Sequence, residues 1–530
     1  MKRRNFLSLL ASTGIVLPSI GNAAPATRGY AHAASLDNPL SGAFARAVTH
    51  SSDNVLVILR LFGGNDGLNT FVPYTSDDYY YARRTSAVQD LSIHAEKVLK
   101  IHNSTTMGFH PALKPLHTLY GEGKVCVVQN VGYPEQDLSH FRSNDIWLSG
   151  TNASEYKESG WLGRFLEERY PDYPQKLPDD PYAVEVGRNL GRTFMGEHTH
   201  LGVNIADTSF VPSKPHNHAA KLSKSGVEQE YVRQMMLQTS TFLQSSLRAE
   251  ALAKGNRVKY PEEDWARSMA FVARMIGGGM KTQVYLVNMP LWDFHLDQLR
   301  DQEDYFVRLS GAMYAFQRDI EAFGVANRVT MLTISEFGRR VTPALSGTDH
   351  GSGSCLFVVG EGVKGGIIGR DPDCSSLDAN ENLRWTYDFR QIYASVLGQW
   401  FEAREADMTT ALMQRRYSQL PIFRSYQQQR TVGNPSTPSN NLPFNGAREG
   451  ITAIFPQPAS DTLTLEFALP STATYATLSL VDMQGRRVLQ PEPIPLAHMT
   501  LNVRSLPSGH YLAVVETPQK RYSEAVQIVR

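Results

Sequence analysis

"NVLVILRLFGGNDGLNTFVPY" (residues 54–74) joins a continuous apolar run to an abrupt pair of glycines. A run that is apolar at successive positions, rather than at alternate ones, indicates a strand buried on both faces, as in a parallel sheet. Gly63 and Gly64 end the run and allow backbone and ligand to approach closely just before Asp66. We therefore expect the folded region to open here with a central strand.

Apolar runs of the same kind recur along the chain, at "KVCVVQNVGY" (124–133), "TQVYLVNM" (282–289), "RVTMLTI" (328–334) and "SCLFVVGEGV" (354–363). Helical patterns lie between several of these runs, for example at residues 110–123 and 305–324. This alternation of strands and helices predicts an α/β domain over residues 50–425, with a mostly parallel sheet sandwiched by helices.

The composition of the chain changes after this domain. Residues 430–450 are rich in Pro, Ser, Asn and Gly, so we expect a linker at residues 426–450. Residues 451–530 then show short alternating segments separated by turns, such as "TLTLEFAL" (462–469). This pattern predicts a small C-terminal antiparallel β-sandwich.

The overall composition is that of a globular protein. The 530 residues include 52 Lys and Arg against 52 Asp and Glu, with 42% hydrophobic and 20% charged residues. Such a balance excludes a disordered chain and a general electrostatic attraction to nucleic acid or an anionic membrane. Three cysteines, Cys126, Cys355 and Cys374, are too few for a disulfide framework.

The N-terminus, "MKRRNFLSLLASTGIVLPSIGNAAPA", combines a basic start, an apolar segment and a small-residue end. This order predicts a signal peptide over residues 1–24. Arg3 and Arg4 resemble a twin-arginine signal, but Lys2 stands where Ser or Thr is usual, so the general secretory route stays open. The apolar segment is shorter than the roughly 20 residues that a spanning helix needs, and we expect no transmembrane segment in the mature chain.

Polar residues that could carry chemistry directly follow several of the apolar runs. Ligands bind outside the carboxyl ends of strands in open α/β sheets, so these positions are candidates for a site. The candidates are Asp66, then Asp293 and His295, then Glu336 and Arg339, and finally Asp349 and His350. Each alone also fits a turn, a cap or a buried polar pair. If they share one cleft, carboxylates and imidazoles suit a divalent cation such as zinc, calcium, magnesium or manganese.

Several motifs resemble, in this order, the exported bacterial family called domain of unknown function 1501: "GGNDGLNTFVPY", "GFHPALKPL", "LSHFRSNDIWLSG", "WDFHLDQ", "SEFGRR" and "DHGSG". The resemblance spans about residues 50–405 and implies the alkaline phosphatase and sulfatase superfamily, with an alkaline phosphatase-like fold. The metal ligands that it implies are Asp66, Asp293, His295, Asp349 and His350.

The chain departs from that superfamily in three ways. Its middle motif is Asp-x-His, where alkaline phosphatases have Asp-x-x-x-His. No histidine lies between His350 and His498, so a second metal site is complete only if His110 or His140 substitutes. None of the cysteines lies in the Cys/Ser-x-Pro-x-Arg context of sulfatases, which argues against standard sulfatase chemistry.

The resemblance also implies a nucleophilic Ser or Thr at a helix start, and Ser139 is the matching residue. A helix N-terminus offers backbone N–H groups and a positive dipole to an anionic ester. Arg142 could add a guanidinium fork for phosphate or sulfate oxygens. Ser139 also fits an ordinary N-cap, and His140 fits a metal ligand, a group behind a ligand or an inert residue.

The C-terminal region carries a second resemblance. "FPQPASDTLTLEF" (455–467), "LVDMQGRRVL" (480–489) and "LPSGHYLAVV" (506–515) are similar to the sorting domains of the type IX secretion system in Bacteroidetes. This implies passage through the periplasm to the cell surface or medium, with the export and type IX machinery as partners. A carbohydrate-binding or adhesive β-sandwich is the alternative.

These features predict an exported, metal-dependent hydrolase-like protein that acts on a phosphate or sulfate ester of a small molecule or glycan. The expected catalytic residues are Ser139, Arg142, Glu336 and Arg339, with His140 as a further metal ligand. The alternative is a catalytically degenerate member of the superfamily that binds a surface glycan or an envelope partner.

Overall fold

The computed structural model describes residues 53–84, 90–187, 191–205, 242–424, 450–455, 459–468, 476–482, 486–493, 498–517 and 521–529. The expected signal peptide (1–24) and nearly all of the expected linker (426–450) lie outside these residues, so both stay predictions.

A nine-stranded sheet forms the centre of the main domain, in the order β13-β5-β12-β9-β1-β8-β6-β7 with β14 beside β5. Each of the five apolar runs forms one of its strands, which confirms that part of the sequence analysis. The strands are β1 (Val55–Leu61), β5 (Val125–Gly132), β6 (Ala183–Val186), β7 (Gly202–Ile205), β8 (Val284–Met289), β9 (Val329–Ile334), β12 (Ser354–Val359), β13 (Gly366–Ile368) and β14 (Tyr387–Asp388).

Most of the sheet is parallel, as expected. Strand β12 pairs antiparallel with both β5 and β9, whereas the other pairings in this sheet are parallel. A strand that is buried on both faces gives a continuous apolar run whether it is parallel or antiparallel. The sequence of β12 therefore did not reveal its direction. Because β12 is antiparallel to its neighbours, its first residue, Ser354, lies at the edge where the parallel strands end. The hydroxyl of Ser354 donates to the carbonyl of Asn65 at 3.1 Å.

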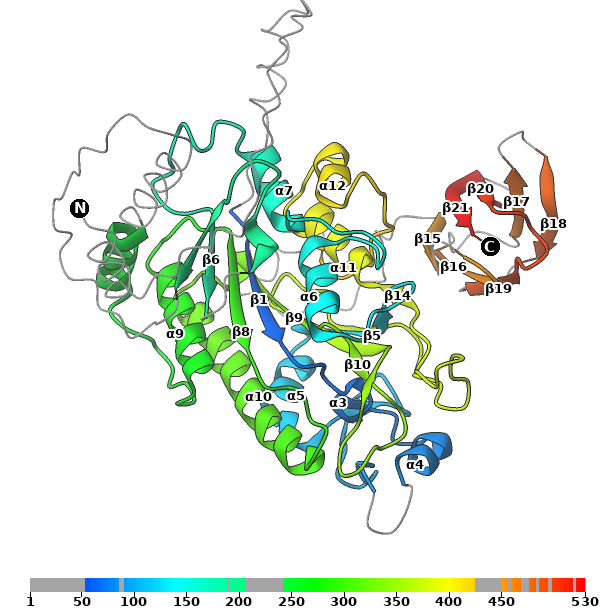
Figure 1. Cartoon of the computed structure of the whole chain (residues 1–530), viewed down its shortest axis with the longest axis horizontal. Coiled ribbons are helices and arrows are strands. Elements are labelled where there is room, and N and C mark those ends of the chain that lie inside the picture. The colour runs from blue at the N-terminus through cyan, green and yellow to red at the C-terminus, as the bar shows by residue number, and fades with distance from the viewer. Residues whose placement is uncertain are drawn as a thin grey trace, which may run out of the picture.

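Helices cover both faces of this sheet (Figure 1). A hydrophobic core lies on each face of the sheet, and alternate residues of β1 point into one or the other. Val57 packs with one set of helices and Ile58 with the other. The first set comprises α5 (Lys114–Gly121), α9 (Asp264–Gly277) and α10 (Gln298–Ala322). The second comprises α6 (His140–Ser149), α7 (Trp161–Arg169), α11 (Phe389–Ser395), η4 (Val396–Trp400) and α12 (Glu405–Ala411).

Shorter elements connect these layers, and several of them lie at the edge where the parallel strands end. They are α3 (Gly67–Thr70), β2 (Phe71–Val72), α4 (Asp77–Arg83), β3 (Leu99–Lys100), β4 (Gly108–Phe109), η1 (Pro111–Leu113), η2 (Arg192–Phe194), η3 (Ala326–Arg328), β10 (Gly338–Arg339) and β11 (His350–Gly351). Strands β10 and β11 pair antiparallel and return the chain to this edge after β9.

The C-terminal region is the expected small antiparallel β-sandwich. One sheet contains β15 (Gly450–Phe455), β16 (Thr462–Ala468) and β19 (His498–Asn502). The other contains β17 (Thr477–Asp482), β18 (Arg487–Pro493), β20 (Gly509–Glu516) and β21 (Arg521–Ile528). Leu463 and Leu501 of the first sheet share one buried core with Leu480 and Val515 of the second.

Two further expectations concern single features of the chain. All three cysteines are free, which agrees with the absence of a disulfide framework. Among the helices that the structure describes, none combines the length and apolar character that crossing a bilayer requires.

The glycine pair after β1 brings two loops of the site edge into contact. Gly63 and Gly64 adopt φ values of 135° and 88°, which residues with a Cβ rarely reach. A Cβ on Gly63 would lie 2.5 Å from the backbone nitrogen of Asp293. Only glycine therefore lets the loop after β1 pack directly on the loop after β8.

Candidate metal centre

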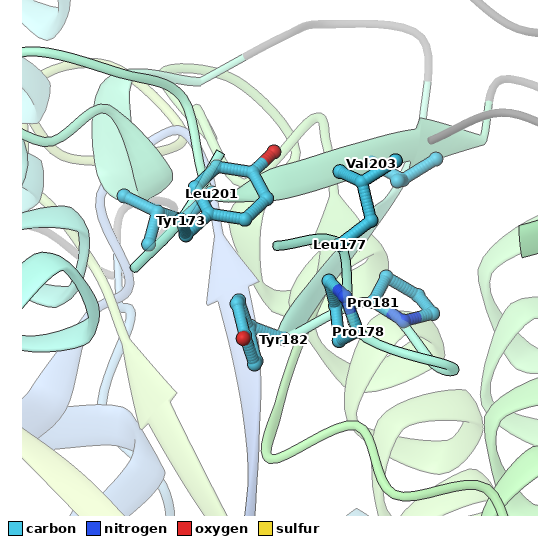
Figure 2. Close-up of a pocket in the computed structure, with 7 residues that line it drawn as sticks. All are labelled: Tyr173, Leu177, Pro178, Pro181, Tyr182, Leu201 and Val203. Carbon is cyan, nitrogen blue, oxygen red and sulfur yellow. The ribbon is translucent and has the colours of Figure 1, made fainter. Parts of the chain in front are cut away.

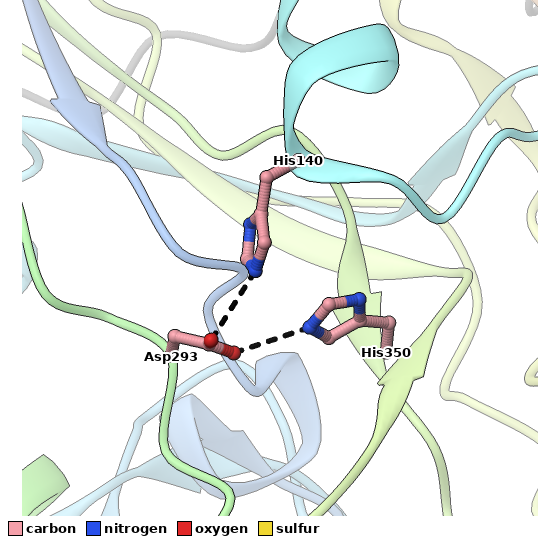
Figure 3. Close-up of side chains that lie close together, drawn as sticks. All are labelled: His140, Asp293 and His350. Carbon is pink, nitrogen blue, oxygen red and sulfur yellow. Dashed lines mark hydrogen bonds and ion pairs between the residues drawn. The ribbon is translucent and has the colours of Figure 1, made fainter.

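Asp293, in the loop after β8, is the point on which the site converges. Its Oδ1 accepts a hydrogen bond from Nη2 of Arg339 at 2.6 Å. The same oxygen lies 2.9 Å from Nε2 of His295 and 3.1 Å from Nε2 of His350. Its Oδ2 lies 3.3 Å from Nε2 of His140. Figure 3 shows His140 at the start of α6 and His350 on β11 both pointing towards this carboxylate.

Each of the three histidine rings is held from behind through its Nδ1. The acceptors are Glu336 Oε1 for His140 (2.9 Å), Asp349 Oδ1 for His295 (3.2 Å) and the carbonyl of Leu138 for His350 (2.8 Å). Because a carbonyl or an ionised carboxylate can only accept, each Nδ1 carries the hydrogen. When such a ring is neutral, its Nε2 is the lone pair that binds a metal ion, and when it is protonated, Nε2 donates to Asp293.

The histidine nitrogens and the carboxylate are close enough to share a proton or a metal ion. Nε2 of His295 lies 3.1 Å from Nε2 of His350, and both face the same oxygen of Asp293. Acceptors in such contact repel one another unless a proton or a metal ion lies between them. One ligand atom each from His140, Asp293 and His350 lie within 4.8 Å of one another, close enough for a single ion to reach all three.

The charges around Asp293 favour its ionised form. Burial by itself raises the pKa of this carboxyl, but the hydrogen bond and charge of Arg339, with the charge of His295 and the hydrogen bond from His350, lower the pKa to about 2. The hydrogen bond to Glu336 raises the pKa of His140, whereas burial lowers the pKa of His350. A carboxylate beside a neutral imidazole is a donor set that suits zinc and other divalent transition ions.

Glu336 and Asp349 lie behind the histidines. Glu336 is buried, and its Oε1 accepts from the backbone amide of Gly63 at 2.8 Å as well as from His140. Asp349 is 55% exposed and contacts His295. These contacts place Glu336 behind His140, and its catalytic role stays a prediction. The structure places Asp349 next to a candidate ligand, where the sequence suggested a ligand itself.

Asp66 faces a different set of partners. Its carboxylate accepts from the amides of Leu68 and Asn69 at the start of α3 and pairs with Nη2 of Arg83 at 2.7 Å. Its second oxygen accepts from Nε2 of Gln298 at 2.5 Å. Asp66 and Arg83 are both fully buried. The expectation that Asp66 binds metal does not agree with these contacts, because structural donors already occupy both of its oxygens.

Arg339 is also committed to the fold. It is 2% exposed, and it donates to the carbonyls of Gly64 and Thr348 at 2.8 Å each and to that of Gly63, in addition to Asp293. This guanidinium ties the loops after β1 and β8 to the loop before β11. The expectation that Arg339 holds the oxygens of an ester stays a prediction, and in this structure its donors have partners within the fold.

Ser139 and Arg142 differ in whether their side chains have hydrogen-bond partners within the fold. Ser139 is the N-cap residue of α6, yet its exposed hydroxyl makes no capping hydrogen bond. The peptide bond before it carries the Leu138 carbonyl that accepts from His350. Arg142 instead donates to the backbone carbonyls of residues 152–153. The Ser139 hydroxyl is thus available beside the histidines, whereas the guanidinium of Arg142 holds a neighbouring loop.

Sequence reasoning missed two groups that build this region. The Leu138 carbonyl carries no side-chain signal at all. Gln298 joins the Asp66 network to the site loop, because its Oε1 accepts from the hydroxyl of Thr348 at 2.7 Å. His110, the other possible substitute ligand, stands apart: its Nδ1 accepts from a backbone amide at 3.1 Å, and burial lowers its pKa to about 4.

Two sequence families match the chain. Residues 53–410 match the family described as Protein of unknown function (DUF1501), and residues 453–529 match the Secretion system C-terminal sorting domain. Both matches confirm the resemblances that the motifs indicated. No curated protein sequence matches the chain.

Similar solved structures are remote. A protein in the alkaline phosphatase superfamily from Vibrio parahaemolyticus is 9% identical, with 84% of this chain and 83% of that chain covered and a TM-score of 0.32. A sulfatase from Pseudoalteromonas sp. is 11% identical, with 88% and 86% covered and a TM-score of 0.30. A match to the BSP domain of a biofilm associated protein, at 14% identity and a TM-score of 0.13, covers 14% of this chain and 13% of that chain.

The family match spans the sheet, both helical layers and every residue of the candidate metal centre, and the second match spans the C-terminal sandwich. The chain belongs to the DUF1501 family and ends in a secretion-system sorting domain.

Proposed function

We propose that this protein is a secreted hydrolase of phosphate or sulfate esters that works with one divalent cation. The observation that carries the proposal is the convergence of three histidines, each anchored at Nδ1, on the carboxylate of Asp293. His140, Asp293 and His350 would hold the ion, with His295 beside them. A bound cation would polarise the ester and lower the pKa of a nearby hydroxyl.

Ser139 is the candidate nucleophile. Its hydroxyl is exposed and free of a capping bond, and its backbone adjoins His350 through the preceding peptide. The N-terminus of α6 presents backbone N–H groups to the same region, and such groups bind anionic oxygens. Because Arg142 and Arg339 donate to backbone carbonyls, these amides are better placed than either guanidinium to hold the oxygens of the ester.

One observation favours a second candidate function, a binding protein without turnover. The two arginines expected to stabilise the ester are both occupied by the fold. A site without a free guanidinium has less to offer a transition state than to a ligand that simply coordinates the ion. The binding role predicts a bound metal ion without ester hydrolysis.

Metal analysis combined with an ester screen distinguishes these functions. The mature protein, incubated with zinc, manganese, magnesium or calcium and then freed of excess ion, should retain about one equivalent. It should then hydrolyse at least one phosphate or sulfate monoester in a broad panel. Retained metal without turnover of any ester would replace the hydrolase with the binding protein, and protein that retains no metal would contradict both.

The sorting domain indicates delivery to the cell surface or the medium. We expect the mature protein to lack the signal peptide at residues 1–24 and the sandwich at residues 451–530. The intact mass of protein recovered from the cell surface measures both cleavages. Recovery of protein that still ends at Arg530 would contradict removal of the sandwich.

A further inference from the structure

Two leucines flank the metal-centre residues on the loop after β8. Leu291 and Leu296 are 70% and 58% exposed, on either side of Asp293 and His295. Single exposed leucines are common on protein surfaces and need no explanation, but a group of them beside a polar site indicates a binding surface.

Leu345 adds a third exposed leucine from a different loop. It is 67% exposed in the turn formed by residues 344–347. That turn packs on the loop after β8, since a Cβ on Gly347 would lie 2.3 Å from the carbonyl oxygen of Phe294. Leu291 and Leu345 also have positive φ values of 73° and 62°, which bulky residues adopt rarely. The fold thus holds these side chains outward in an uncommon backbone conformation.

An open pocket of about 420 Å³ lies beside these leucines and shares its wall with the metal centre. This volume falls in the range of small-molecule sites. Its apolar lining comes from Leu291, Phe294, Leu296 and Tyr305, and its polar lining includes Asp293 and His295. The pocket therefore runs from the candidate ligands to an apolar surface.

A second cavity does not offer such a site. Figure 2 shows Tyr173, Tyr182 and Leu201 among the side chains around it. Its volume is about 20 Å³, which is room for about one water molecule. None of the metal-centre residues lines it.

The charge of the larger pocket excludes a strongly anionic ligand. Its two remaining lining residues, Asp301 and Asp304, form ion pairs with Arg300 (2.8 Å) and Arg308. None of the described residues that line it is Lys or Arg. A ligand with several sulfate or phosphate groups would meet no cation there, whereas an uncharged apolar group would meet leucine and aromatic surface.

We propose that this pocket binds the apolar alkyl or aryl group of a monoester whose phosphate or sulfate lies at the metal centre. The inference rests on the proposed function and narrows its substrate to esters of apolar alcohols. Polysulfated glycans are excluded by the same lining. Leu291 and Leu296, which are exposed and line the pocket, then shield the far part of the apolar group from water.

Calorimetric titration of the zinc-loaded mature protein with ethyl phosphate and hexyl phosphate tests the proposal. A fully buried methylene is worth about fourfold in affinity, so a pocket open on one side should give about twofold for each. Hexyl phosphate should therefore bind roughly 15-fold more tightly than ethyl phosphate. The double variant Leu291→Ser/Leu296→Ser should reduce this ratio to about threefold or less. Leu252→Ser removes a leucine that is 62% exposed outside the pocket and should leave the ratio unchanged.

This experiment tests the pocket and the hydrolase function by separate measurements, so either proposal can be contradicted without the other. Equal affinities for the two esters would overturn the pocket even if the protein hydrolyses both. A chain-length preference that survives in the double variant, or that disappears in Leu252→Ser, would overturn it too. A preference that depends on Leu291 and Leu296 supports the pocket even if no ester is hydrolysed, and the lack of hydrolysis would then count against the proposed function alone.

Discussion

Asp66 and Asp293 occupy equivalent places in the fold and have different surroundings. Each follows a central parallel strand, β1 or β8, at the same edge of the sheet. Asp66 is 1% exposed and is held by Arg83, by Gln298 and by two amides of α3. Asp293 is 39% exposed and faces the Nε2 atoms of three histidines.

The comparison teaches that position after a strand does not decide what a carboxylate does. Donors that carry hydrogens surround Asp66, so its charge is already balanced within the fold. Asp293 has one permanently charged donor, Arg339, and otherwise faces histidine nitrogens that can either donate a proton to it or bind a cation with it. A carboxylate of the first kind stabilises structure, and one of the second kind calls for a cation.

The largest expected effect separates turnover from metal binding within the Asp293 region. Ser139→Ala should lower ester turnover about 10³-fold or more, because the nucleophile is lost. Metal content and the free energy of unfolding should not change, since the hydroxyl makes no capping hydrogen bond. Rates on the best ester from the screen, with metal analysis of the same sample, measure this. Full turnover in the variant would assign the attack to another hydroxyl or to water.

The next effect concerns the Asp66 region. Asp66→Ala leaves Arg83 buried without its partner, and breaking a buried ion pair in this way lowers the free energy of unfolding by about 3–5 kcal/mol. Asp293→Ala should cost much less, because Arg339 keeps its bonds to backbone carbonyls. Urea unfolding of both variants measures the difference. Equal losses of stability would remove the distinction between the two carboxylates.

A smaller effect tests the anchors behind the histidines. Asp349→Asn weakens the acceptor for Nδ1 of His295, which lies beside the ion, and should reduce metal affinity about 10-fold, as expected for a group that orients a histidine at the site. Asp172→Asn changes an exposed aspartate outside the site and is the matched control. Competition with a chelating dye gives both affinities. An Asp349→Asn variant that loses metal completely would make Asp349 a ligand, as the sequence first suggested.

The smallest effect concerns the link between the two regions. The Thr348 hydroxyl donates to Gln298, which in turn holds Asp66. Thr348→Val removes this buried hydrogen bond and should lower the free energy of unfolding by about 1–2 kcal/mol. Metal affinity should fall only slightly, because His350 keeps its bond to the Leu138 carbonyl. A loss of metal as large as that of Asp293→Ala would show that the two regions act as one site.

The sequence predicted the strands of the central sheet well, because burial on both faces leaves a continuous apolar run. It did not reveal β6 and β7, which are short strands of four residues each, with β7 at the edge of the sheet. It did not show the direction of β12 either, since the same run serves a parallel or an antiparallel strand. Strand pairing at a distance has no local signal.

The candidate site was partly predictable for a similar reason. Asp293 follows β8, and His350 lies on the short strand β11 that returns the chain to the same edge after β9, so the sheet brings these two candidates together. Their partners were not all visible, since Arg83 lies 17 residues from Asp66 and Gln298 lies 232 residues from it. The long side chain of Arg339 looked free in the sequence and is buried among carbonyls. The sequence shows which chemistry a side chain is capable of, but its hydrogen-bond partners and burial depend on residues that are distant in the sequence.

Metal stoichiometry of wild-type protein and two aspartate variants tests the central claim most directly. After loading with zinc and removal of excess ion, the wild type and Asp172→Ala should each retain about one equivalent, and Asp293→Ala should retain none while staying folded. An Asp293→Ala protein that keeps its metal, or a folded wild type that binds none, would contradict the account of the histidines and their shared carboxylate.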